Sequence, residues 1–193
     1  KMARPAGFDR DEVLGKATAT FWEHGYHATS ITDLVEATRL QPGSLYAAFE
    51  SKQGLFLAAL DHYARQSKQR LRQVLGAAQD PLSGIREFFG QLASAGGVPG
   101  RGCLLVNTVL EVGRHDPVVQ ARVKTHLAEI EGELRSALQQ ARTLGQLGAD
   151  KSPQALARFL MTTIWGLRVL NGIDTDAQQA RLVVDQALSI LDD

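Results

Sequence analysis

Residues 40–49 read LQPGSLYAAF, and this stretch predicts a short helix. Pro42 suits the first position of a helix, because the N–H that proline lacks would be unpaired there anyway. Leu40 and Leu45 flank that position as a hydrophobic staple. The predicted helix ends near Phe49 and has few other apolar side chains to bury, so it depends on neighbouring helices for its stability.

The residues before this stretch predict two more helices. Ser30 is a favourable cap with Asp33 three positions after it, which indicates a short helix. Before that, Asp9 caps a longer helix that Gly25 ends. Residues 38–41 form a four-residue turn between the two short helices. Two short helices joined by such a turn and packed under a first helix describe a helix-turn-helix unit.

The composition of the 42–49 helix suits close approach to another molecule. Small residues allow a helix to enter a groove, and Gln41, Ser44 and Tyr46 can hydrogen-bond to phosphates or base edges. A helical hairpin in an ordinary bundle has the same pattern, so the pattern alone supports DNA binding and plain packing about equally.

Three stretches together resemble the DNA-binding domain of TetR/AcrR-type transcriptional repressors. They are ATSITDLV at 28–35, LQPGSLYAAF at 40–49 and SKQGLF at 51–56. The resemblance implies a helix-turn-helix DNA-binding domain over residues 7–67 and a ligand-binding and dimerisation domain over residues 68–193.

The resemblance also implies partners and contacts. The partners are a palindromic double-stranded DNA operator, a second copy of the chain and a small-molecule inducer whose identity the sequence does not give. The two 42–49 helices of the dimer would enter successive major grooves. Gly43 would allow close backbone approach, while Tyr46 and Lys52 would bind phosphates. The implied DNA-binding residues are Ser30, Thr32, Gln41, Pro42, Gly43, Ser44, Tyr46, Ala47 and Lys52.

One position departs from the family pattern. Serine or threonine usually caps the helix that enters the groove, whereas this chain has Gln41 followed by Pro42. Glutamine is a poor helix cap, but its amide can hydrogen-bond to adenine or to a phosphate. We therefore expect the fold to follow the family more closely than the base contacts do.

Composition sets the class of the whole chain. The 193 residues include 21 Lys+Arg and 21 Asp+Glu, and the hydrophobic fraction is 44%, as in ordinary globular proteins. Nearly every segment has helical periodicity, which predicts an all-α fold of about nine helices. The later ones are expected near 81–95, 102–113, 117–144, 153–171 and 176–191. No apolar run approaches the length of a membrane span, and the single cysteine fits the reducing cytoplasm, where we expect the protein to act.

The helix expected over residues 102–113 is the first place to look for an effector site. Cys103, Asn107 and Glu111 are spaced four apart, so a continuous α-helix would place them on one face. Residues 101–107 also resemble the copper-responsive, ComR-type subgroup of the family. A buried thiol and a satisfied amide remain the simpler interpretation, and the scattered histidines predict neither a metal site nor another cofactor. Further candidate ligand contacts are Phe88, Trp165 and Arg168.

Two apolar stripes near the C-terminus predict a dimer surface. Two helices from each protomer would form a four-helix bundle about a two-fold axis, although the same stripes could simply close the core of the monomer. The first stripe contains Leu156, Phe159, Leu160, Thr163, Ile164 and Leu167, and the second contains Val183, Val184, Ala187 and Leu191.

Enzymatic function is not expected. The chain has no glycine-rich phosphate loop, no H-E-x-x-H motif and no nucleophile elbow. The leading hypothesis is a ligand- or redox-responsive repressor. The alternative is a helical carrier of small molecules, or an adaptor, without DNA binding.

Overall fold

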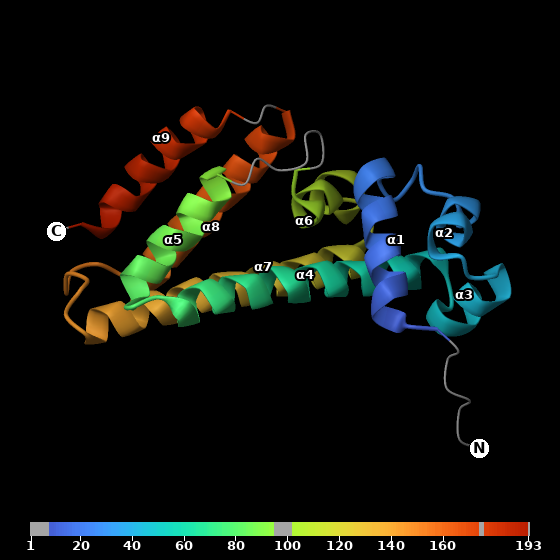
Figure 1. The fold of residues 1–193 in the computed structure, drawn as a ribbon, viewed down its shortest axis with the longest axis horizontal. Coiled ribbons are helices and arrows are strands. Elements are labelled where there is room, and N and C mark those ends of the chain that lie inside the picture. The colour runs from blue at the N-terminus through green and yellow to red at the C-terminus, as the bar shows by residue number, and fades with distance from the viewer. Residues whose placement is uncertain (1–7, 95–101, 174–175, 193) are drawn as a thin grey trace, which may run out of the picture. The chain divides into compact units, whose positions relative to one another are not determined.

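The computed structural model describes residues 8–94, 102–173 and 176–192, and the secondary structure of these residues is helical (Figure 1). This confirms the predicted all-α fold. The helices of the N-terminal part are α1 (Arg10–His24), α2 (Ile31–Thr38), α3 (Pro42–Phe49) and α4 (Lys52–Ala77). Those that follow are α5 (Pro81–Ser94), α6 (Leu104–Thr108), α7 (Pro117–Thr143), α8 (Pro153–Ile173) and α9 (Ala177–Leu188), with a 3₁₀ turn at Ser189–Leu191.

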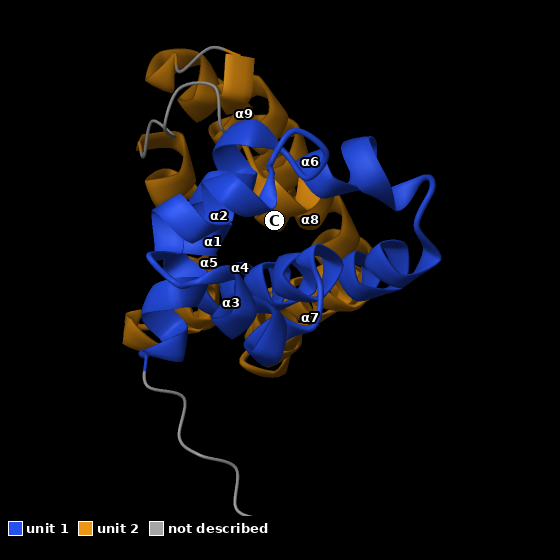
Figure 2. Cartoon of the chain, turned by 90° about the vertical axis from the view of Figure 1, so that its right-hand side faces the viewer, with its two compact units in different colours: residues 1–66, 107–124 blue, residues 67–106, 125–193 orange. Residues whose placement is uncertain are grey.

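The chain forms two compact units (Figure 2). Unit 1 comprises residues 1–66 and 107–124, and unit 2 comprises residues 67–106 and 125–193. The sequence places a boundary close to residue 67, but nothing in it associates 107–124 with the N-terminal helices.

The core of unit 1 is formed by helices whose ends are marked in the sequence. The Asp9 side chain caps α1 by accepting from the N–H groups of Asp11 and Glu12, and Gly25 ends the helix with a φ of +81°. Glu12 does not complete a capping box with Asp9 but pairs with Lys16 at 2.6 Å. Side chains from the four N-terminal helices are buried together in this unit: Val13, Leu14, Ala17, Phe21, Leu34, Leu45, Phe49, Leu55, Phe56, Ala59 and Leu60.

The segment that begins at residue 102 differs from the prediction. Instead of one helix over 102–113, α6 spans only Leu104–Thr108, and Val109–Gly113 forms a π-helical turn. The α-helical spacing that would align Cys103, Asn107 and Glu111 is therefore not present. A π turn widens the hydrogen-bonding pattern by one residue, and apolar periodicity over so short a stretch does not reveal it.

Unit 2 is built around α5, α8 and α9 together with the adjoining parts of α4 and α7. Ile85 and Phe89 of α5 and Leu160 of α8 have no exposed surface, and Leu138 of α7 is equally buried. Ion pairs lie at the surface of this core, including Lys68 with Glu129 and Arg72 with Glu133, both at 2.6 Å.

Candidate nucleic-acid interface

Helix α3 is held by one face and leaves the other uncovered. Leu45 and Phe49 are 4% and 5% exposed, and they attach the helix to the core of unit 1. The Arg10 guanidinium lies over the Phe49 ring, 4.5 Å from the ring centroid. The opposite face is exposed and consists of Gln41, Pro42, Gly43, Ser44, Tyr46 and Ala47. We call these six residues the α3 face.

The side chain of Gln41, at the start of α3, does not cap the helix. Gln41 occupies the cap position, and its main-chain carbonyl accepts from the N–H groups of Ser44 at 2.9 Å and Leu45 at 3.1 Å. Its side chain makes no capping hydrogen bond. Because Pro42 has no N–H, the first turn has one donor fewer to satisfy. The Gln41 amide is thus available to a partner molecule.

Two glycines near α3 have opposite surroundings. A Cβ atom built on Gly43 would meet nothing within 4 Å, so this glycine is not required by packing. A Cβ atom on Gly54 would lie 2.0 Å from the carbonyl oxygen of Phe49, where α3 passes into α4. Gly54 is therefore required by the fold. Gly43 is not, and its lack of a side chain leaves the main chain of the α3 face accessible to a partner molecule.

The N-terminus of α2 lies in the same unit and is capped as predicted. The Ser30 hydroxyl accepts from the N–H of Asp33 at 3.1 Å, and the Asp33 carboxylate accepts from the N–H of Ser30 at 2.7 Å. The Ser30 hydroxyl also donates to the Asp33 carboxylate at 2.8 Å. The two hydrogen bonds that the carboxylate accepts lower the pKa of Asp33, the main-chain bond most and the hydroxyl bond next. Thr32, in the first turn of α2, is exposed. Since the Ser30 N–H is already used by the cap, Thr32 is the freer of the two predicted contacts.

Lys52, the first residue of α4, rests on an aromatic cluster. Its ammonium group lies 4.6 Å from the centroid of the Tyr26 ring, a cation–π distance. The Tyr26 ring in turn packs 4.7 Å from Phe56, which lies 4.9 Å from Phe21. Burial, and secondarily the charge of Asp116, raise the pKa of Tyr26, so it remains an uncharged platform.

Sequence reasoning missed one cation in the turn that precedes α3. Arg39 is exposed and has a φ of +60°, a left-handed conformation that few residues other than glycine adopt. Its N–H closes the end of α2 by donating to the carbonyl of Val35 at 2.8 Å. The turn chemistry at 38–41 was visible in the sequence, but the left-handed arginine was not.

The predicted effector-site residues are distributed over both units. Asn107 is exposed and Glu111 is bound by main-chain N–H groups within unit 1, while Cys103 in unit 2 is half-buried. Arg101, which begins the ComR-type run, lies outside the described residues. In unit 2, Phe88 is buried, and Trp165 and Arg168 are half-buried. The indole Nε1 of Trp165 is itself buried and has no hydrogen-bond partner among the residues that the structure describes.

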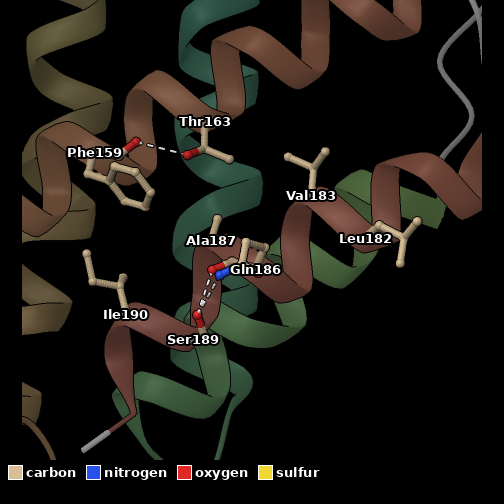
Figure 3. Close-up of a pocket in the computed structure, with 8 residues that line it drawn as sticks. All are labelled: Phe159, Thr163, Leu182, Val183, Gln186, Ala187, Ser189 and Ile190. Atoms are coloured by element: carbon tan, nitrogen blue, oxygen red, sulfur yellow. Dashed lines mark hydrogen bonds between the residues drawn. The ribbon is translucent and has the colours of Figure 1, made fainter.

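The two C-terminal stripes divide between core and surface. Figure 3 shows an open groove between α8 and α9 in which Phe159 and Thr163 face Val183 and Ala187. Leu182, Gln186, Ser189 and Ile190 complete its lining and were not predicted. The other predicted interface residues are buried within unit 2 itself: Leu156, Leu160, Ile164, Leu167, Val184 and Leu191.

The described residues include no helix long and apolar enough to cross a membrane. They also contain no group of three or more histidine, cysteine, aspartate or glutamate side chains arranged to bind a metal ion.

Comparison with known proteins places this geometry in context. Residues 13–59 match the family model for bacterial regulatory proteins of the tetR family. Residues 82–187 match a model described as tetracyclin repressor-like, C-terminal domain.

Individual relatives agree with these matches over most of the chain. The HTH-type transcriptional repressor ComR of Escherichia coli is 34% identical over 170 residues, which cover 86% of this chain and 80% of ComR. The HTH-type regulator YezE of Bacillus subtilis is 30% identical over 194 residues, which cover 99% of this chain and 100% of YezE. A cysteine mutant of the TetR family regulator CifR, solved with 26-bp operator DNA, has a TM-score of 0.84 and 34% identity, and the match covers 96% of this chain and 98% of that one.

Proposed function

The chain belongs to the TetR family of bacterial regulatory proteins, and from that premise we propose that it is a transcriptional repressor that binds operator DNA as a homodimer. The observation that carries this proposal is the α3 face, which is exposed and combines small residues with the polar groups of Gln41, Ser44 and Tyr46. CifR, which is similar to this chain over nearly its whole length, was solved with operator DNA. A repressor of this kind acts where the chromosome is, in the cytoplasm.

In this proposal α3 enters the major groove by the N-terminal end of its exposed face. Gly43 lets the main chain approach the bases, Ser44 and Ala47 face the base edges or the sugar–phosphate backbone, and the Gln41 amide hydrogen-bonds to adenine. Tyr46 and Lys52 bind phosphates, Lys52 with the help of the helix dipole at the start of α4.

Phosphate contacts at the edge of this surface fix its orientation on the duplex. Thr32 and Ser30 at the start of α2 approach one strand, and Arg39 adds a positive charge in the turn before α3. Base contacts give sequence preference, whereas these phosphate contacts give affinity that falls with salt concentration.

The second copy binds through α8 and α9. The groove of Figure 3 exposes the apolar side chains Phe159, Leu182, Val183 and Ile190, each at least 41% exposed in the single chain. Two such helix pairs related by a two-fold axis form a four-helix bundle that covers these side chains. A symmetric dimer then binds a palindrome whose half-sites lie about 34–36 Å apart, or a little more.

An effector that releases the repressor must prefer the form that does not bind DNA. We place its site in unit 2, where Phe88 supplies apolar surface and Arg168 lies one helical turn from Trp165. The buried Trp165 indole, unpartnered among the described residues, supports a ligand with a hydrogen-bond acceptor, because burying an unused donor is costly. Cys103, a half-buried residue of the same unit, remains part of the proposal as an effector or redox contact.

Selection from a random pool of DNA duplexes tests this function directly. We expect the protein to enrich a palindrome, and the affinity for that duplex to fall steeply as salt concentration rises. A folded, dimeric preparation that enriches no sequence, even after unfolding and refolding to remove any bound ligand, would refute the repressor and favour a small-molecule carrier or adaptor.

A further inference from the structure

The carboxylate of Glu111, in unit 1, is bound by main-chain N–H groups of a turn that is far from it in sequence. Glu111, in the π turn Val109–Gly113, accepts hydrogen bonds from the N–H of Tyr26 at 3.0 Å and of His27 at 2.8 Å. Both N–H groups belong to the turn between α1 and α2, and His27 is 84 residues from Glu111 in sequence. Hydrogen bonds to an ionised acceptor are roughly twice as strong as neutral ones.

The turn is shaped around this carboxylate. A Cβ atom on Gly25 would lie 2.8 Å from one Glu111 carboxylate oxygen and 3.0 Å from the other. Gly25 also has a φ of +81°, which an L side chain rarely adopts. Glycine at this position therefore serves two purposes, since it ends α1 and leaves room for Glu111.

Two other contacts attach the same segment to α4. Asp116, which caps α7 by accepting from the N–H groups of Val118 and Val119, also accepts a hydrogen bond from the Gln53 amide at 2.5 Å. Arg122 pairs with Asp61 at 2.5 Å. Within unit 1, segment 107–124 is thus attached to the N-terminal residues at these three points. Of the three, the Glu111 contact is the one that reaches the turn leading into α2.

We propose that Glu111 is a positioning residue for operator binding. By fixing the α1–α2 turn it sets where α2 begins, and α2 in turn carries α3. Tyr26, whose N–H donates to Glu111, is also the ring beneath Lys52, so the same contact sets the position of a phosphate-binding cation. Rare π turns are often found at functional sites, which agrees with this role. The inference rests on the proposed function, because it concerns affinity for the operator.

The charge of Glu111 gives the test a distinctive sign. Glu111→Gln removes one negative charge, and by general electrostatics this change strengthens binding to DNA. Positioning predicts the opposite, because the neutral amide cannot accept charge-assisted hydrogen bonds from the turn. Glu129→Gln is the matched control, since Glu129 is a glutamate of unit 2 whose carboxylate pairs with Lys68 at 2.6 Å.

The first measurement is operator affinity of the full-length variants over a range of salt concentrations. We expect Glu111→Gln to weaken operator binding about tenfold, the change that roughly 1.4 kcal/mol produces, and Glu129→Gln not to weaken it. Operator affinity within twofold of the unaltered protein would overturn the proposal.

The second measurement is amide hydrogen exchange in the free protein. We expect faster exchange at Tyr26 and His27 in Glu111→Gln, with unchanged protection at Phe21 in the core of α1. Unchanged exchange at Tyr26 and His27 would overturn the proposal. If Glu111→Gln loses protection throughout unit 1, Glu111→Asp, which keeps the charge but shortens the side chain, is judged by the same criteria. Failure of the unaltered protein to bind any operator would refute the proposed function and this role together, while the exchange data would still show whether the contact exists.

Discussion

The ammonium group of Lys52 lies 4.6 Å from the centre of the Tyr26 ring. This contact holds a half-buried cation at the N-terminus of α4, the helix that follows α3. An aromatic ring attracts a cation less strongly than a phosphate group does. The Lys52 ammonium group can therefore exchange its contact with Tyr26 for a contact with a DNA phosphate.

Lys52→Ala therefore should weaken operator binding by removing a cation from the DNA surface. We expect affinity to fall on every sequence to a similar extent, and the slope of log affinity against log salt to decrease by about 1 for each phosphate that is no longer neutralised. Tyr46→Ala should lower affinity in the same sequence-independent manner. Lys124→Ala, which removes an exposed lysine of α7, is the control and should change neither quantity as much. An unchanged affinity in both test variants would contradict the proposed docking of α3.

Gln41→Ala should change specificity more than stability. The Gln41 side chain makes no capping hydrogen bond, so we expect the midpoint of thermal unfolding to stay nearly unchanged. Without a bidentate hydrogen bond to adenine, discrimination at one base pair of each half-site should fall by about 1–3 kcal/mol. The check is competition between the selected operator and single-substitution operators. Equal discrimination at every position in the variant and the unaltered protein would exclude base contact by Gln41.

The two glycines near α3 should respond oppositely to alanine. Gly43→Ala adds a methyl group in open space and favours helix, so unfolding should be unaffected or slightly harder, whereas operator affinity should fall because the methyl group keeps the main chain from the bases. Gly54→Ala places a methyl group 2.0 Å from the Phe49 carbonyl and should reduce the free energy of unfolding by about 1–3 kcal/mol. Thermal unfolding and operator titration of both variants provide the check. A stable Gly54→Ala protein would contradict the close approach of α3 and α4.

The capping box of α2 predicts a pH dependence of stability. The main-chain N–H and hydroxyl of Ser30 lower the pKa of Asp33 in the folded protein, below the value of about 3.9 expected when unfolded. The box therefore contributes stability above that pH, and the contribution is lost as the pH falls through the folded-state pKa. Asp33→Asn should be less stable than the unaltered protein near pH 6, and the difference should shrink in acid. Asp80→Asn, at the start of α5, should show a pH dependence of the same sign, since hydrogen bonds from Ser83 lower the pKa of Asp80 in the same direction. A pH-independent difference for Asp33→Asn would contradict this account.

Local signals in the sequence were enough to predict the helices of the helix-turn-helix unit. Ser30 with Asp33, Pro42 at the start of α3 and Gly25 at the end of α1 each act within a few residues, and the structure contains each of these features. The exposure of the α3 face likewise follows from its lack of apolar residues. These features depend on neighbouring residues, and a single sequence displays them.

Contacts between distant segments were not visible in the same way. The hydrogen bonds from Tyr26 and His27 to Glu111 join segments more than 80 residues apart, and the π turn that carries Glu111 has no pattern of its own. The apolar stripe of α8 is a third example. Leu160 is fully buried and the adjacent Phe159 is 42% exposed, although both side chains are apolar. Hydrophobic periodicity indicates which faces of a helix are apolar, but it does not indicate which of these faces a partner chain covers.

The groove between α8 and α9 gives the sharpest test of the dimer. Phe159→Glu and Val183→Glu each place a charge where the proposed two-fold partner would bury it, at a cost that an interface does not tolerate without a compensating partner. Both positions are 42% exposed in the single chain, so the folded monomer should persist. Leu144→Glu is the control, because Leu144 is 64% exposed, lies in the turn after α7 and does not line the groove. Light scattering should show a monomer for the two groove variants and a dimer for the control. Operator binding should fall together with dimerisation, since one protomer contacts only one half-site. A dimer that survives both groove substitutions would place the two-fold interface elsewhere on the chain.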